Sequence, residues 1–135
     1  MEKEGYVSLW IGNIKSDDEL MAYVELEYTD DGDCIPSKFL KDFSIDIDDF
    51  DEDFIERVCH ENKVSSISEL ISGCSYEEII LPKIEEKMEG QFQDKVNSAI
   101  LLYNFDFDEK IDRVNTSQYT FTFICSVKYK YSKGR

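Results

Sequence analysis

The residues best suited to chemistry gather in residues 42–56, which read DFSIDIDDFDEDFIE. Eight of these fifteen residues are acidic, and apolar side chains are interspersed among the carboxylates. Carboxylates at this density can bind a metal ion, act as general acid and base, or recognise a basic partner. Each role requires particular neighbouring residues, so the rest of the sequence decides between them.

Calcium binding by an EF-hand loop needs oxygen ligands at loop positions 1, 3 and 5, glycine at position 6 and glutamate at position 12. A loop that starts at Asp49 places Phe54 where glycine is needed and His60 where glutamate is needed. A loop that starts at Glu27 uses Gly32 correctly but places Lys38 at position 12. Both frames fail, so we predict no metal site, and a weak cation-binding module remains as an alternative.

Zinc binding and cysteine catalysis depend on His60, the single histidine, and on its neighbour Cys59. The other cysteines, Cys34, Cys74 and Cys125, do not fall at the spacing of a zinc finger or ribbon. Neighbouring residues on a helix point about 100° apart, so Cys59 and His60 would not face each other. We therefore expect reduced thiols and no cofactor.

Catalysis by a carboxylate pair requires a pocket that separates the two pKa values. The acidic residues here cluster at predicted helix starts and in loops, where water would solvate them. The sequence also contains no glycine-rich phosphate loop and no nucleophile motif. These observations predict that the protein is not an enzyme.

Recognition of a basic partner fits the overall charge. The chain has 135 residues, a formal charge of −15 and 41% hydrophobic residues, which is too apolar for a disordered chain. Residues 16–61 hold 17 acidic residues against Lys38, Lys41 and Arg57. Such a surface repels nucleic-acid phosphates and speeds association with a basic protein. The simpler alternative is that these acidic residues only keep the chain soluble.

The candidate partner-binding surface combines the carboxylates of the acidic stretch with one aromatic anchor. Its predicted residues are Asp46, Asp48, Asp49, Phe50, Asp51 and Asp53. Other aromatic residues that lie among carboxylates are Tyr28, Phe39, Phe43 and Phe54. Helical spacing predicts that most of these are core residues, and that one or two left exposed would serve as interface anchors.

Three strands are predicted, near residues 6–12, 97–107 and 118–131. The first is apolar on both faces and ends at a Gly-Asn turn signal, which favours the interior of a sheet. The last two are expected to pair antiparallel, and the third alternates apolar and polar residues over thirteen positions.

Several helices are predicted between these strands. Serine capping boxes open helices at Ser16, Ser66 and Ser75, and Pro36 suits the first position of another. Apolar residues at 54, 55, 58 and 59 follow helical spacing, and Pro82 is expected to interrupt a helix and start a new one that ends near residue 89. This order of elements predicts a single α+β domain over residues 1–135, with short helices on one face of a small antiparallel sheet.

Localisation follows from what the chain does not contain. The first residues, MEKE, are charged and no apolar segment follows them, so no secretory signal is predicted. No run of 18 apolar residues occurs, so no membrane span is predicted. We expect a cytoplasmic protein.

Several segments together resemble the immunity protein 22 family of bacterial polymorphic toxin systems. The similar segments are VSLWIGN at 7–13, DGDCIPSKF at 31–39, DF at 42–43, DEDF at 51–54, SY at 75–76 and ILLYNF at 100–105. The resemblance extends over about residues 6–130 and consists mainly of hydrophobic positions and turns. It implies a cytoplasmic antidote that binds and neutralises a cognate toxin, and it carries over no catalytic residues.

The leading hypothesis is therefore an immunity protein that blocks a cognate toxin, expected to be basic, through the acidic surface. The alternative is an acidic nucleic-acid mimic or regulatory protein that acts on a basic host protein. Neither hypothesis involves binding to nucleic acid or membrane, and no motif in the sequence specifies an oligomeric state.

Overall fold

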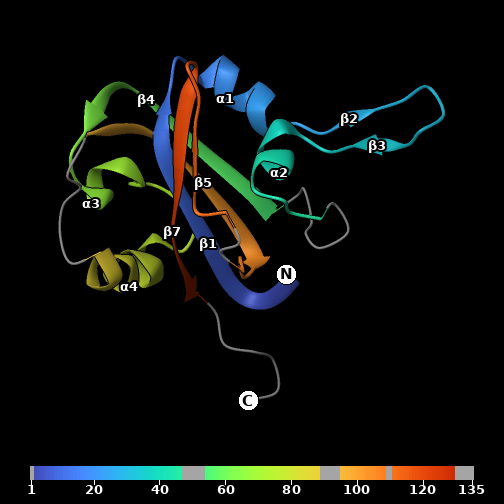
Figure 1. Cartoon of the computed structure of the whole chain (residues 1–135). Helices are drawn as coiled ribbons and strands as arrows, with labels where there is room; N and C mark the ends of the chain where they lie inside the picture. Colours follow the sequence, from blue (N-terminus) through green and yellow to red (C-terminus); the bar gives the residue numbers. More distant parts are fainter. Residues whose placement is uncertain (1, 47–53, 89–94, 109–110, 130–135) are drawn as a thin grey trace.

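The computed structural model describes residues 2–46, 54–88, 95–108 and 111–129 (Figure 1). Within them lies a five-stranded antiparallel sheet in the order β4-β5-β1-β7-β6. Its strands are β1 (Glu2–Ile14), β4 (Ile55–Val64), β5 (Val96–Phe105), β6 (Arg113–Asn115) and β7 (Tyr119–Lys128). A two-stranded sheet joins β2 (Glu27–Tyr28) to β3 (Cys34–Ile35), and the helices are α1 (Asp17–Val24), α2 (Lys38–Asp42), α3 (Ile67–Leu70) and α4 (Glu77–Met88). The predicted α+β class is confirmed.

Strand β1 lies at the centre of the sheet, as its two apolar faces predict. It pairs with β5 on one side and with β7 on the other. The expectation that the last two predicted strands pair with each other is wrong, because β1 separates them. Burial of β5 on both faces makes it an interior strand too, and β4 covers its remaining edge.

Strand β1 also runs past Gly12, where the sequence predicted its end. A Cβ atom at Gly12 would lie 1.7 Å from the Thr120 carbonyl oxygen of β7. Glycine is therefore required here by the close approach of a neighbouring strand, a role it often has inside strands. The turn interpretation of this residue is wrong.

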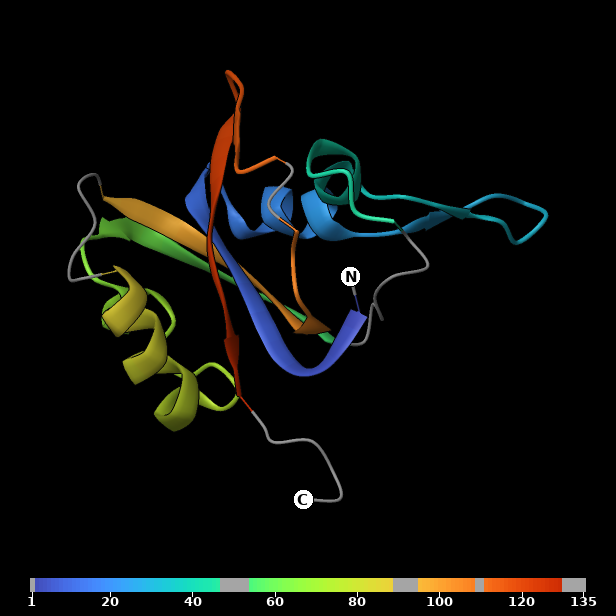
Figure 2. The ribbon, with the colours of Figure 1, turned by 60° about the horizontal axis from the view of Figure 1, so that its bottom comes forward.

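Helices cover both faces of the sheet, and the predicted single covered face is wrong (Figure 2). Helices α3 and α4 bury one face through Leu70, Ile80 and Ile84. Helices α1 and α2 bury the other through Leu20 and Phe39, which pack around Trp10 of β1. The physical reason is that β1 and β5 are apolar on both faces and need cover on both sides.

Strand β7 contributes side chains to both hydrophobic clusters, the one beneath α1 and α2 and the one beneath α3 and α4. Its pairing with β1 shifts register between Leu9 and Trp10, which face Cys125 and Phe123 respectively. The residue between those partners, Ile124, is the extra residue of a β-bulge. A bulge shifts the alternation of side chains between the two sheet faces by one residue. The odd-numbered residues of β7 before Ile124 therefore face α1 and α2, and those after it face α3 and α4.

Residues 55–59 form the start of β4 and Phe54 lies just before it, so the predicted helix there is wrong. Ile55 and Cys59 pack on the cluster beneath α1 and α2, whereas Val58 packs on the opposite cluster. A strand with both faces covered satisfies this spacing as well as a helix does. Pairing with β5 decides in favour of the strand.

Proline does not interrupt α4, which contains Pro82 in its interior. The predicted break is wrong, although a proline at such a position costs about 3 kcal/mol. Ile80 and Ile84 flank it and are fully buried, so packing on the sheet stabilises both halves of one helix. No helix within the described residues is long and apolar enough to cross a membrane.

Serine caps at the starts of α1 and α3 agree with the sequence, whereas the predicted helix start at Pro36 is wrong. The hydroxyl of Ser16 accepts a hydrogen bond from the Glu19 amide at 3.2 Å, and that of Ser66 accepts one from the Glu69 amide at 3.3 Å. Helix α2 begins two residues after Pro36, because the hydroxyl of Ser37 caps it through the Leu40 amide at 3.2 Å.

Candidate binding surface

The most prominent exposed element is the hairpin formed by β2 and β3, which projects from the body of the protein (Figures 1 and 2). The amide of Thr29 donates to the carbonyl of Asp33 at 2.8 Å, and the amide of Gly32 donates to the carbonyl of Thr29 at 2.9 Å. Gly32 has φ +88°, a left-handed conformation that glycine adopts readily. The polar segment at residues 29–33 is thus the tip of a hairpin.

The hairpin presents acidic and aromatic side chains together. Asp30, Asp31 and Asp33 are exposed at its tip, and Tyr28 on β2 is 57% exposed. An exposed tyrosine beside carboxylates has the composition of an interface anchor with an acidic rim. Among the aromatic residues that the sequence placed near acids, Phe39 and Phe43 are fully buried, whereas Tyr28 and Phe54 are exposed.

The surface around the hairpin has the same charge. Residues 16–46 contain ten acidic side chains and two lysines. Nine of the ten acidic side chains are exposed. Arg57 on β4 approaches Asp17 on α1, with 3.6 Å between Nε and Oδ1. The local field is therefore negative over the hairpin and α1.

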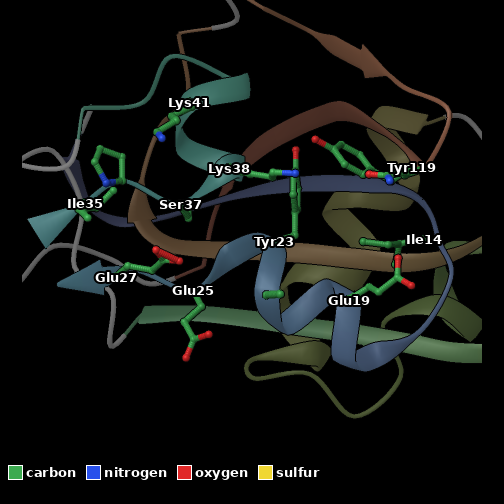
Figure 3. Close-up of a pocket in the computed structure, with 13 residues that line it drawn as sticks. Ile14, Glu19, Tyr23, Glu25, Glu27, Ile35, Ser37, Lys38, Lys41 and Tyr119 are labelled. Atoms are coloured by element: carbon green, nitrogen blue, oxygen red, sulfur yellow. The ribbon is translucent and has the colours of Figure 1, made fainter. Parts of the chain in front are cut away.

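A cleft of about 390 Å³ lies at the base of the hairpin (Figure 3). Helix α1 contributes Glu19 and Tyr23 to its lining, and α2 contributes Lys38 and Lys41. Carboxylates and ammonium groups thus line the same cleft, which gives it a mixed charge unlike the acidic hairpin. This mixture favours neither a simple cation nor a simple anion as its ligand.

Asp42 is an acidic residue of this region that joins elements of the fold. The hydroxyls of Tyr23 and Tyr119 donate to its Oδ2 atom at 3.0 and 2.6 Å. Burial, followed by the hydrogen bond that Tyr119 donates to the Asp42 carboxylate, raises the pKa of Tyr119 to about 12. Burial and the charge of Asp42 likewise raise the pKa of Tyr23. Both hydroxyls stay protonated at neutral pH and join α1, α2 and β7 through one carboxylate.

The sequence-predicted binding residues fall mostly outside the described ranges. Asp46 is described, and its side chain is exposed after the end of α2. Asp48, Asp49, Phe50, Asp51 and Asp53 lie outside the described residues. Phe54, predicted to anchor a helix, is instead 43% exposed just before β4. The sequence analysis missed the hairpin, whose one signal was an acidic glycine turn between two short segments that suit strands.

The candidate metal and thiol residues have other contacts. His60 donates from Nε2 to the Leu70 carbonyl oxygen at 2.9 Å, which joins β4 to α3. Burial, with a contribution from Asp17, raises the pKa of the Cys59 thiol, which disfavours the reactive thiolate. Across the described part of the chain, no group of three or more histidine, cysteine, aspartate or glutamate side chains is arranged to hold a metal ion.

Comparison with known proteins gave one match. A protein-family model described as Immunity protein 22 matches residues 7–130. No curated protein and no solved structure matched the chain.

Proposed function

The chain belongs to the immunity protein 22 family, and on that premise we propose that it binds a cognate bacterial toxin and neutralises it. The observation that carries this proposal is the family match, which extends over nearly the whole chain. The protein acts as a binding partner in the cytoplasm and performs no reaction of its own. It inhibits the toxin by covering the surface that the toxin needs for its activity.

The proposed contact surface is acidic, and the proposed toxin domain is basic. One part of the surface is the hairpin tip with Tyr28. The other part continues the acidic sequence through Asp46, Asp48, Asp49, Phe50, Asp51 and Asp53. Support comes from the formal charge of −15 and from the nine exposed carboxylates in residues 16–46. A basic active site that binds phosphates would be attracted by such a surface and blocked by it.

The two kinds of residue have different proposed roles. Exposed carboxylates act at a distance, so they accelerate the encounter and make it sensitive to salt. Aromatic anchors act after contact, because they exclude water and slow dissociation. The complex should therefore form fast at low salt and remain bound through its aromatic contacts.

Calorimetry with the toxin domain encoded beside this chain's gene tests the proposal. We expect tight binding that weakens at least about tenfold between about 50 mM and about 500 mM salt. The variant D48K/D49K should weaken binding, and the matched variant E85K/E86K on α4 changes the charge equally at exposed sites elsewhere. Absence of binding by the wild-type chain would overturn the function. Equal affinity of the two variants would overturn only the placement of the surface.

An acidic regulator of a basic host protein remains the second reading of the charge. It would bind a host protein with the same salt dependence and would leave the toxin unaffected. The toxin arm of the calorimetric experiment therefore separates the two functions.

A further inference from the structure

A second surface lies near the start of β4, beside the α3–α4 connection and the end of β7 (Figure 1). It is a cleft of about 460 Å³. We propose that this cleft binds an arginine side chain of the partner protein, with Glu56 as the anion and tyrosine rings as the walls. This inference rests on the proposed function for the identity of the partner.

The carboxylate of Glu56 is fixed at the cleft by neutral donors. Its Oε1 atom accepts hydrogen bonds from the Tyr103 hydroxyl at 2.8 Å and from the Ser75 amide at 3.1 Å. Among the described residues, its Oε2 atom receives one contact, from the Ser75 hydroxyl at 3.5 Å. No lysine or arginine among the described residues forms an ion pair with Glu56. The carboxylate is thus oriented, and within the described residues no cation balances its charge.

Neighbouring acids make the field at the cleft more negative. Burial first, and then the charges of Glu56 and Glu77, raise the pKa of the Cys74 thiol to about 11. Burial first, and then the interactions with Tyr76 and Glu4, raise the pKa of Tyr129. A cation that enters the cleft therefore meets the Glu56 carboxylate, and the charges of Glu77 and Glu4 act from outside the lining.

Three tyrosine rings form an aromatic wall. The ring centroids of Tyr76 and Tyr129 lie 4.7 Å apart, and those of Tyr103 and Tyr129 lie 5.2 Å apart with planes at 89°. The Tyr129 hydroxyl donates to Asn104 Oδ1 at 2.7 Å, which fixes its ring. Ring faces attract cations, and guanidinium groups stack on them more often than ammonium groups do.

Tyr76 is exposed and held in an unusual backbone conformation. Its φ is +61°, and its side chain is 45% exposed. A left-handed conformation is uncommon for a bulky residue, and such strain gathers at functional sites. The Tyr76 carbonyl accepts from the Ile80 amide at 3.0 Å at the start of α4. The ring itself packs against Tyr129 on one side and remains partly exposed to solvent.

Arginine fits these features better than other cations do. Its planar guanidinium can stack on a ring and still donate two hydrogen bonds to one carboxylate. The weakly occupied Oε2 atom of Glu56 leaves room for such a pair. Lysine, a compact and strongly hydrated charge, would gain less from the rings.

Two variants test the cleft with the adjacent-gene toxin domain as the probe. Glu56→Gln keeps an oxygen that can accept from Tyr103 and Ser75, and it removes only the charge. Tyr76→Gly removes the ring and relieves the left-handed strain. We expect each to weaken toxin binding at least about tenfold, with a melting temperature within about 4 °C of wild type. Glu85→Gln on exposed α4 is the matched control and should bind like wild type.

Double-mutant cycles between Glu56→Gln and alanine variants of each toxin arginine and lysine identify the occupant. Coupling of at least about fivefold with one arginine is expected. Wild-type affinity of both cleft variants, or coupling with a lysine instead, would overturn the arginine site while leaving toxin binding intact. Failure of the wild-type chain to bind the toxin would contradict both the proposed function and this site.

Discussion

Tyr119 on β7 donates a hydrogen bond of 2.6 Å to Asp42 at the end of α2, although 77 residues separate them in the sequence. The same carboxylate oxygen accepts from Tyr23 of α1 at 3.0 Å. One aspartate of the acidic stretch therefore connects α1, α2 and β7 through its side chain.

Asp42→Asn should destabilise the fold by about 1–3 kcal/mol, because both tyrosine hydroxyls lose a charged acceptor. Urea unfolding measures this change. Asp31→Asn at the hairpin tip, an exposed site, should change stability by less than about 0.5 kcal/mol. Equal stability of Asp42→Asn and wild type would contradict the structural role of this carboxylate.

Alkaline pH should weaken the hydrogen bond between Tyr119 and Asp42. The pKa of Tyr119 is raised from 10.0 to about 12 in the folded state, so folding favours the protonated hydroxyl. The stabilisation is fully present below pH 10 and is lost as the pH rises towards about 12. Unfolding curves across this range should show a fall in stability that is smaller in Tyr119→Phe. A Tyr119→Phe variant with the same alkaline loss as wild type would refute this origin.

Gly12→Ala should unfold or strongly destabilise the protein, by more than about 3 kcal/mol, because the added Cβ would overlap the Thr120 carbonyl. Thermal unfolding followed by circular dichroism measures the loss. Ser126→Ala on β7, the strand that contains Thr120, removes a hydroxyl without adding volume and is the control. A Gly12→Ala protein with wild-type melting temperature would mean that β1 and β7 are farther apart than the structure shows.

Charge reversal at the hairpin tip tests its proposed role in the encounter. Asp30→Lys with Asp31→Lys should slow association with the toxin about tenfold at low salt, with little change in dissociation. Surface-plasmon resonance separates the two rates. Glu85→Lys with Glu86→Lys is the control of equal charge. The hairpin would have no special role if both pairs slowed association equally.

Sequence patterns predicted elements that depend on local chemistry. Serine caps at Ser16 and Ser66 and the two apolar faces of β1 were read correctly, because each depends on neighbouring residues alone. Local patterns gave wrong predictions where contacts between residues distant in the sequence decide the structure. The β-bulge at Ile124 and the β4 strand depend on partners that no local pattern names.

The candidate surface was predictable only in part. The excess of acidic over basic residues in residues 16–61 predicts a charged face, with one or two exposed aromatic residues on it. Tyr28 and Phe54 are exposed, whereas Phe39 and Phe43 are core residues around Trp10. The Glu56 cleft was not predicted, because it assembles residues from four separate segments of the chain.

Co-expression tests the central claim most directly. Bacteria that produce the adjacent-gene toxin domain are grown with and without this chain, and surviving colonies are counted. We predict that the toxin alone kills and that the wild-type chain restores growth, whereas an equally abundant Gly12→Ala chain does not. Death of cells that contain soluble, folded wild-type chain would contradict the assignment as an immunity protein.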